Sequence, residues 1–260
     1  MKTQLKPIGL HIIIMFLMLY ACNSDDDQNT TNTYTGNAIT FGSGTVESWI
    51  TTTNTDTPLE LGLRLSLEAL SDIEALPEDD LVFVVPLHDK ASQVTAYEHI
   101  TIQWEPAGHM PPVFLAPHFE IAFFEISNSE RLTIPVYDAN IPVIEAAVND
   151  FPDVDKIPTG YIKFPGQGGY YPEAGKHWLT EDVLELTTFN TYIAHGTYDK
   201  KHIFLEAKFT MDYLQSLTQL NQTLAQPVIF EKSDTYYPTT LNARKSSESI
   251  EITLSNFIKR

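Results

Sequence analysis

Three segments of the chain place a histidine where it could take part in chemistry. His109 lies in a loop sequence that contains two prolines. His118 precedes Glu120 by two residues, and His177 follows a glycine-rich segment. Neutral imidazoles and carboxylates are the ligands from which proteins build sites for zinc, iron, manganese and nickel. With Glu206 as a second carboxylate, these residues are candidates for a site that holds a divalent transition metal.

Each of these histidines also has a structural explanation, and the sequence leaves both explanations open. A histidine in a proline-rich loop commonly hydrogen-bonds a carbonyl group and organises the turn. His118 with Glu120 could clasp a strand to a loop, and His177 could fill a packed corner beside Trp178. No pair has the tight His-x-His or His-x3-His spacing of a strong metal motif. The sequence also lacks a phosphate-binding glycine loop, a nucleophile elbow and an HExxH helix, so it indicates no particular reaction.

Aromatic residues around the glycine-rich segment 166–169 indicate a second kind of site. If their rings are exposed, Tyr161, Tyr170, Tyr171 and Trp178 could stack on the faces of sugars or contact another small molecule. Packing in a core or a hairpin is the more usual role of such rings. Carbohydrate binding is therefore an alternative function.

Strands are the main elements that must position these residues. Leucines at every second position from Leu59 to Leu67 predict a half-buried strand with the leucines on its buried face. In segment 118–127 the same alternation puts His118 and Glu120 on the face opposite the apolar residues. Further strand patterns cover 81–85, 100–104, 191–195, 202–209 and 249–257, and helical patterns cover 142–149 and 211–220.

Many short strands with few helices predict an α+β fold that is predominantly antiparallel β. We expect a sandwich or a barrel-like arrangement with a few short helices. No repeat of 20–50 residues is present, which argues against solenoids and propellers. No linker rich in glycine, serine or proline divides residues 37–260, so this region is expected to form a single β-rich domain.

The first 21 residues have the pattern of a lipoprotein signal peptide. Lys2 and Lys6 precede an apolar run that is shorter than the roughly 20 residues needed to span a bilayer. The run ends in the residues Leu-Tyr-Ala-Cys at positions 19–22, which resemble a bacterial lipobox. Cleavage before Cys22 and acylation of its thiol would anchor the protein in the membrane. We therefore expect a lipid-anchored protein of the cell envelope, located at the outer membrane.

Acidic and polar residues follow the predicted lipidation site. Ser24 and the aspartates at 25–27 resemble the surface-export signal of lipoproteins in the Bacteroidetes, although an acidic run is also typical of a solvated linker. We expect residues 22–36 to form a tether and the cell surface to be the location.

Composition excludes several classes of partner and of structure. The chain has 34 acidic and 16 basic residues, a formal net charge of -18. Removing the two lysines of the signal peptide leaves 14 against 34, or -20. Such a charge argues against nucleic acid and against an anionic membrane surface as partners, because both attract cations. The one cysteine excludes a disulfide framework and a thiolate metal cluster.

Three segments resemble a bacterial family of secreted proteins and lipoproteins of unknown function, typified by a hypothetical protein from Thermus. Segment 103–112 matches the family pattern W-x-P-x-G-H-x-P-P, segment 117–120 matches P-H-F-D/E, and segment 175–178 matches G-x-H-W. By position, the resemblance carries the family's polar pattern onto His109, His118, His177 and Glu206. It covers most of residues 37–260 and implies a shared fold more than an activity, because the family has none assigned.

The chain departs from the family pattern at several of these positions. Glu120 stands where the family has aspartate, and Ala122 stands where it has a further histidine. His195 stands in place of a tyrosine, and Ala207 with Lys208 replaces proline and methionine. If the family's histidines bind a metal, this chain has lost one ligand.

Three functions therefore remain open. The first, which we favour, is an envelope lipoprotein of unknown activity that binds a ligand or a partner outside the cytoplasm. The second is a metal-dependent enzyme with a His/Glu site. The third is a carbohydrate-binding accessory protein.

Overall fold

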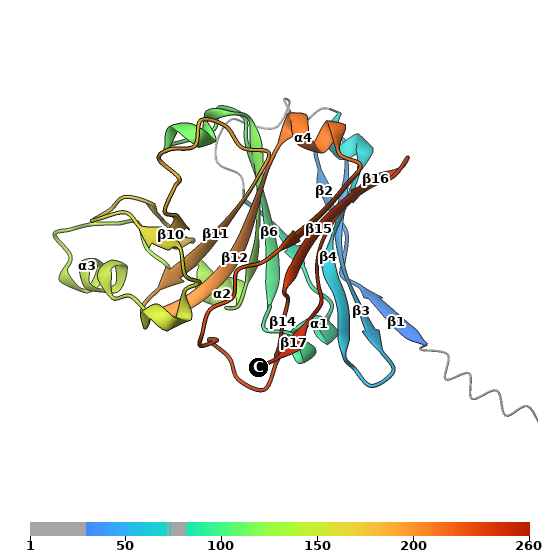
Figure 1. Ribbon diagram of the computed structural model, residues 1–260, viewed down its shortest axis with the longest axis horizontal. Helices are drawn as coiled ribbons and strands as arrows, with labels where there is room; N and C mark the ends of the chain where they lie inside the picture. The colour runs from blue at the N-terminus through green and yellow to red at the C-terminus, as the bar shows by residue number, and fades with distance from the viewer. Residues whose placement is uncertain (1–29, 72, 74–81) are drawn as a thin grey trace, which may run out of the picture.

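Two antiparallel β-sheets face each other in the computed structural model, which describes residues 30–71, 73 and 82–260 (Figure 1). The seven-stranded sheet contains β1 (Thr31–Thr35), β2 (Ile39–Phe41), β3 (Gly44–Thr53), β4 (Pro58–Ser66), β13 (Gln219–Thr223), β15 (Thr240–Lys245) and β16 (Ser249–Ser255). The eight-stranded sheet contains β5 (Val82–Pro86), β6 (His99–Glu105), β7 (His118–Phe124), β8 (Tyr161–Lys163), β9 (Tyr170–Tyr171), β10 (Gly175–Thr180), β11 (Thr191–Tyr198) and β12 (Lys201–Thr210).

Short helices and one small strand pair complete the described fold. The strand pair is β14 (Tyr236–Tyr237) with β17 (Ile258–Lys259). The helices are α1 (Asp89–Val94), α2 (Asn128–Arg131), α3 (Pro142–Asn149) and α4 (Met211–Ser216), with 3-10 turns η1 (Leu67–Leu70), η3 (Pro112–Leu115) and η4 (Val154–Lys156). The predicted class, an α+β fold that is mostly antiparallel β, is confirmed.

The main hydrophobic core lies between the two sheets. Leu61, Leu63 and Leu65 of β4 project into it from one sheet, and Phe119 and Phe123 of β7 project into it from the other. All five side chains are almost completely buried. Because side chains alternate along a strand, the polar residues between these positions face the opposite side of each sheet.

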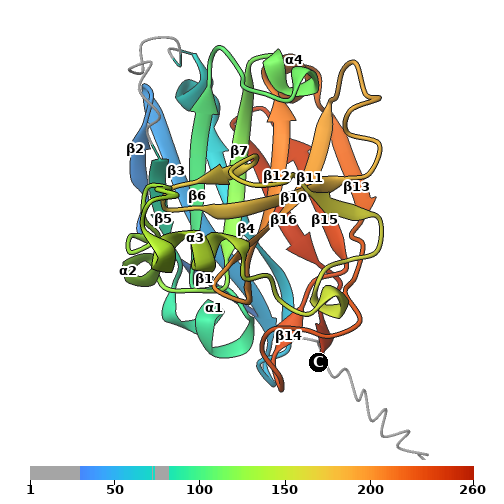
Figure 2. The same ribbon diagram turned by 90° about the vertical axis from the view of Figure 1, so that its left-hand side faces the viewer.

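The outer face of the eight-stranded sheet is covered by other elements. Strand β10, which pairs with β11 near one end of this sheet, curls back over it, and helices α2 and α3 lie on the same side, away from the seven-stranded sheet (Figures 1 and 2). On β7 the residues that face this side are His118, Glu120 and Ala122, opposite the core residue Phe119. The predicted separation of His118 and Glu120 from the apolar face of their strand is therefore confirmed.

The leucine-rich segment forms a strand, but its two ends differ from the prediction. Leu61, Leu63 and Leu65 are buried as expected. Leu59 is 36% exposed, and Leu67 begins the turn η1. The pairing of β4 with β16 starts at Glu60, and the register of β4 with β3 shifts between Thr51 and Thr52, so Leu59 lies at an irregular end of the strand.

Two predicted segments were wrong in their extent. The helix predicted over 211–220 ends at Ser216, and Gln219 then begins β13, which pairs with β15. The predicted tether 22–36 includes β1, whose threonines pair with β3 along its edge. Threonine favours strands, and Tyr34 of β1 packs against the core, so a polar composition did not prevent this segment from joining the sheet.

The predicted signal peptide 1–21, the lipidation site Cys22 and the acidic run lie outside the described residues. Among the residues described, no helix is both long and apolar enough to cross a membrane.

Candidate functional site

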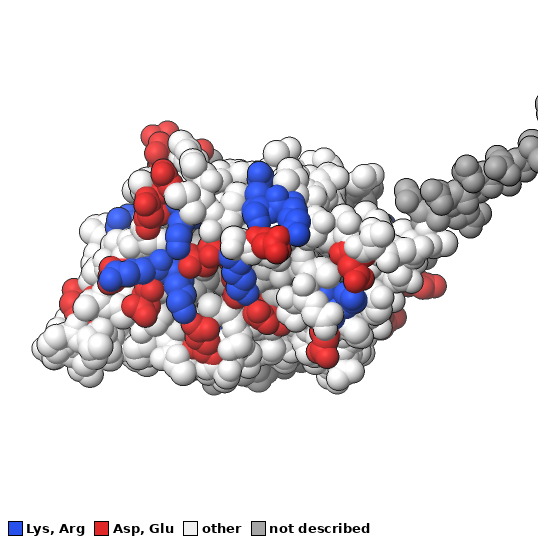
Figure 3. Space-filling view, turned by 90° about the horizontal axis from the view of Figure 1, so that it is seen from below, with Lys and Arg blue, Asp and Glu red and all other residues white. Residues whose placement is uncertain are grey.

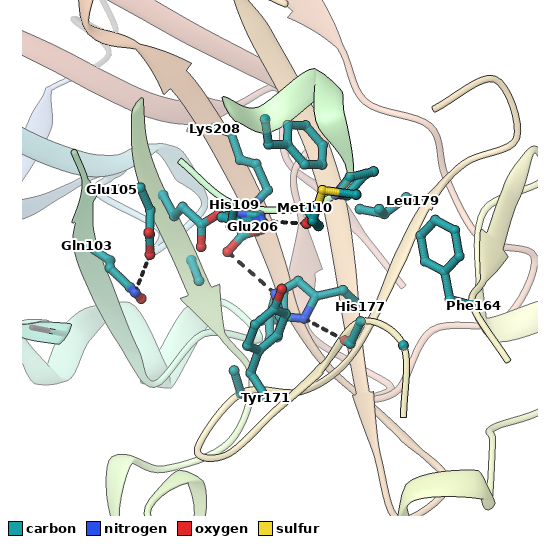
Figure 4. Close-up of a pocket in the computed structure, with 18 of the residues that line it drawn as sticks. Gln103, Glu105, His109, Met110, Phe164, Tyr171, His177, Leu179, Glu206 and Lys208 are labelled. Carbon is teal, nitrogen blue, oxygen red and sulfur yellow. Dashed lines mark hydrogen bonds and ion pairs between the residues drawn. The ribbon is translucent and has the colours of Figure 1, made fainter. Parts of the chain in front are cut away.

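A pocket of about 840 Å³ opens on the outer face of the eight-stranded sheet (Figure 4). Strands β6, β7 and β12 form its floor, and its walls are formed by the segment that follows β6 and by β10 with the segments on either side of it. The polar residues of the floor include Glu120, Glu206 and Lys208. The apolar walls include Met110, Pro112, Phe114, Phe164, Leu179 and Leu184. The floor is therefore charged, whereas the walls are largely hydrophobic.

Strand register brings the charged residues of the floor together. Glu120 on β7 is paired directly with Lys208 on β12, and Ala122 is paired with Glu206 two residues further along. Alternation turns these residues to the same side, away from the core residues Phe119 and Ala207. The two carboxylates and the ammonium group thus come from two adjacent strands that are far apart in sequence.

His109 reaches the floor from a tight loop whose backbone segments lie close together. The backbone N–H of His109 donates to the carbonyl of Phe114 at 3.0 Å. Gly108 has a φ of +60°, and a Cβ atom there would lie 2.1 Å from the Phe114 carbonyl oxygen. Only glycine therefore fits before His109 without moving the loop.

Glu120 is the centre of a compact cluster. One of its carboxylate oxygens lies 2.7 Å from Nε2 of His109 and 3.3 Å from Nε2 of His118, and the same oxygen contacts the ammonium of Lys208. Burial alone would raise the pKa of Glu120, but Lys208 and the two histidines outweigh it and hold this pKa well below its usual value. Burial would lower the pKa of His109, yet its hydrogen bond to Glu120 raises it overall.

A second carboxylate lies on the other side of Lys208. Glu206 is 2.8 Å from the Lys208 ammonium and 3.7 Å from Nε2 of His177. Burial would lower the pKa of Lys208, but the carboxylates of Glu120 and Glu206 together raise it above its ordinary value. For Glu206, burial and the charge of Glu120 raise the pKa, and Lys208 with His177 lowers it overall. Lys208 is thus a buried cation between two anions.

The predicted site residues separate into two groups around Lys208. Ligand atoms of His109, His118 and Glu120 all lie within 4.8 Å of one another, as a metal site requires. Among the described residues, this is the one group of three or more histidine, cysteine or acidic side chains that meets this distance. Of the three candidate histidines, His109 and His118 therefore converge on Glu120. His177 does not join them, because it lies on β10, beyond β11 and β12, and contacts Glu206 instead.

The predicted aromatic ligand-binding residues are mostly packed inside the protein. Tyr170 and Trp178 are each only 6% exposed, and their polar atoms bond to Pro135 and Thr197. Of the two roles that the sequence left open for them, these two rings therefore have the packing role, because neighbouring side chains cover them. Tyr171 is 42% exposed and lines the pocket, with its ring 5.2 Å from that of His177.

Lys208 is the main functional residue that the sequence reasoning missed. It lies two positions after Glu206 in a predicted strand, so the two side chains share a face. A lysine that shares a strand face with a glutamate two positions away is a signal for a buried ion pair, because a buried ammonium needs a partner. In Figure 4, Met110 lies beside His109 and Tyr171 beside His177, whereas Phe164 lies farther away, next to Leu179.

A separate polar network lies outside this pocket. His202 is 3.0 Å from His195 and 2.8 Å from a carboxylate oxygen of Glu125, to which Tyr237 also donates. The adjoining cavity has only about 30 Å³, room for a water molecule rather than a ligand. Hydrogen bonds link these four residues into a chain that leaves Nε2 of His195 without a partner, and the chain is best explained as a structural network.

Comparison with known proteins gives no match. No family model, no curated protein and no solved structure is similar to this chain. The family resemblance of the three histidine segments stays a prediction.

Proposed function

We propose that this protein is a lipid-anchored, ligand-binding protein of the bacterial cell envelope. The pocket on the eight-stranded sheet is the observation that carries the proposal. Its volume of about 840 Å³ falls in the range of about 300–1,000 Å³ that is typical of small-molecule sites. It also combines apolar walls with a few convergent polar groups, which is the usual composition of such sites.

The distribution of polar groups indicates the chemistry of the ligand. An apolar or aromatic body would pack against Met110, Phe164 and Leu179. A polar head group would reach the floor, where Glu206 and Lys208 offer an acceptor and a donor. The exposed ring of Tyr171 adds a stacking surface at the side of the pocket. A small organic molecule with one polar end suits this arrangement better than a fully polar sugar.

The attachment to the membrane rests on the sequence of the amino-terminal segment. The net charge of -18 disfavours electrostatic attachment to anionic lipids. On the face drawn in Figure 3, basic and acidic side chains are intermixed instead of forming a basic patch. An acyl chain on Cys22 would provide the attachment that surface charge does not. A Cys22→Ala variant should leave the membrane fraction, and its retention after a high-salt wash would contradict the anchor.

The pocket can be tested with 1-aminoanthracene, a fluorescent aromatic amine. We expect saturable binding of one molecule and loss of that binding in Ala122→Trp, because Ala122 lines the floor and a large ring there fills the pocket. If circular dichroism shows that Ala122→Trp disturbs folding, Ala122→Leu is the substitute, because its smaller side chain fills less of the pocket. Val228→Trp is the matched control, because Val228 is exposed and lies outside the pocket. Equal binding by the filled variants and the control would contradict the proposal.

A further inference from the structure

The three histidines of the pocket share one feature of their hydrogen bonding. Nδ1 lies 2.7 Å from the Met110 carbonyl in His109, 2.7 Å from the Ala116 carbonyl in His118 and 3.2 Å from the Gly169 carbonyl in His177. A carbonyl oxygen can only accept, so Nδ1 carries the proton in each ring. In the neutral ring, Nε2 then carries no proton, and its lone pair is free to bind a cation. Backbone carbonyls orient metal-binding histidines in this way.

Two of these Nε2 atoms point at the same oxygen atom. Nε2 of His109 and Nε2 of His118 lie 2.7 Å and 3.3 Å from one oxygen of Glu120. A neutral ring with its proton on Nδ1 cannot donate to that oxygen, so each contact needs either a second proton on the ring or a cation between the atoms. Zinc bonds of about 2.0–2.1 Å place tetrahedral ligand atoms about 3.3 Å apart. The His118 contact of 3.3 Å has this spacing, and the His109 contact of 2.7 Å would have to lengthen to reach it.

Lys208 already supplies a cation at this place. Its ammonium contacts Glu120 and lies 2.8 Å from Glu206, and the side chain is almost fully buried. Two carboxylates face one ammonium, so the carboxylates exceed it by one negative charge. A divalent ion beside Glu120 would more than offset that excess, while Lys208 keeps its contact with Glu206.

We propose that the floor of the pocket is an exchangeable cation site. A divalent transition metal ion of the zinc type binds to Nε2 of His109, Nε2 of His118 and the carboxylate of Glu120. The ion displaces the Lys208 ammonium from Glu120 and leaves it paired with Glu206. Three protein ligands leave one coordination position free, which is the pattern of sites that bind water or a ligand. That a ligand of the pocket takes this position rests on the proposed function, whereas metal binding does not.

The test is a titration of the protein, purified from membranes in detergent, with Co²⁺ followed by its visible absorption, and then with Zn²⁺ by calorimetry. We expect one equivalent to bind, with the absorption of a tetrahedral nitrogen and oxygen site. His109→Ala and Glu120→Gln should weaken binding by at least about tenfold, the lower end of what even supporting residues contribute. His88→Ala, which removes an exposed histidine outside the site, should leave it unchanged.

Lys208→Met separates this proposal from a fixed hydrogen-bond network. The variant removes the competing ammonium, so the affinity for Zn²⁺ should rise by about tenfold or more, a gain of about 1.4 kcal/mol. Lys176→Met, which removes another buried lysine that bonds to the Gly166 carbonyl, is the matched control and should bind as the unaltered protein does. Lys208→Gln, a smaller change in polarity, serves if Lys208→Met does not fold.

Two results would overturn the proposal. The first is weaker or unchanged Zn²⁺ binding in both folded Lys208 variants. The second is binding that survives His109→Ala and Glu120→Gln. Because these titrations contain no organic ligand, either failure would leave the pocket proposal intact, and the 1-aminoanthracene result would decide that proposal separately.

Discussion

Lys208 on β12 and Glu120 on β7 are direct cross-strand partners whose charged groups meet at the buried floor of the pocket. Neither strand pattern alone places them together, because the pairing depends on the register between segments 88 residues apart. The low polarity of the surroundings strengthens their attraction but makes either charge costly alone. Removing the charge of either Lys208 or Glu120 should therefore also destabilise the sheet that carries them.

Removing one member of this pair should destabilise the metal-free protein. Breaking a buried ion pair from one side typically costs about 3–5 kcal/mol, because the remaining charge is left without a partner. We expect Lys208→Met to lower the free energy of unfolding by this amount in urea denaturation with a chelator present. The double variant Lys208→Met/Glu120→Gln should recover part of the loss. Strictly additive losses would show that the two side chains do not interact.

His99 should make stability depend on pH in a defined window. It is buried and stacked on Phe124, and burial, with the charge of Arg131, lowers its pKa from 6.5 to about 4. Between these values the unfolded chain binds a proton that the native protein does not, so the free energy of unfolding falls as pH falls from about 6.5 to 4. A shift of this size amounts to about 3 kcal/mol.

The variant His99→Phe should remove that contribution while keeping the stacked ring. Denaturation curves from pH 7 to pH 4 should show a smaller loss of stability for His99→Phe than for the unaltered protein. His88→Phe, at an exposed position, should keep the original pH dependence. Equal slopes for His99→Phe and the unaltered protein would refute the assignment.

Tyr171 and Trp178 should respond differently to truncation. Trp178 is packed against Phe151 and Lys163, so Trp178→Ala should cost about 3–5 kcal/mol of stability, as large-to-small changes in a core do. Tyr171→Ala should change stability by less than about 1 kcal/mol and weaken 1-aminoanthracene binding severalfold, because its ring is partly exposed in the pocket. A large loss of stability in Tyr171→Ala would place that ring in the core instead.

Gly108 should be essential for the position of His109. Gly108→Ala puts a Cβ atom against the Phe114 carbonyl and forces a positive φ on alanine, for which we expect a cost of at least about 1–2 kcal/mol. Gly160→Ala is the matched control, because Gly160 also has a positive φ but nothing lies within 4 Å of its added Cβ. Thermal unfolding should rank Gly108→Ala well below Gly160→Ala. Equal stability of the two variants would mean that the short distance between Gly108 and the Phe114 carbonyl does not affect the free energy of unfolding.

Local patterns predicted the parts of the site that depend on a single strand. The alternation in segment 118–124 was enough to place His118 and Glu120 on one face and Phe119 on the other. The helix α3 was also predicted at its observed bounds, because a proline at its start and a regular apolar spacing mark it within one segment. These features require no knowledge of which strands are neighbours.

Long-range pairing decided the features that the sequence did not reveal. The end of the predicted helix 211–220 instead begins β13, because the edge of β15 offers it hydrogen bonds. The burial of Tyr170 and Trp178 depends on how β9 and β10 fold over the sheet. The role of Lys208 depends on the register between β7 and β12. The sequence indicates that Lys208 needs a partner, but it does not show which strands are neighbours or in which register they pair.

The central claim is that the pocket floor exchanges the ammonium of Lys208 for a metal ion. A crystal of the protein grown with Zn²⁺, with anomalous scattering collected at the zinc edge, tests it most directly. The account predicts one anomalous peak at about 2.0–2.1 Å from Nε2 of His109 and of His118, with Lys208 moved away from Glu120. The absence of a peak at saturating zinc, with Lys208 still between Glu120 and Glu206, would contradict it.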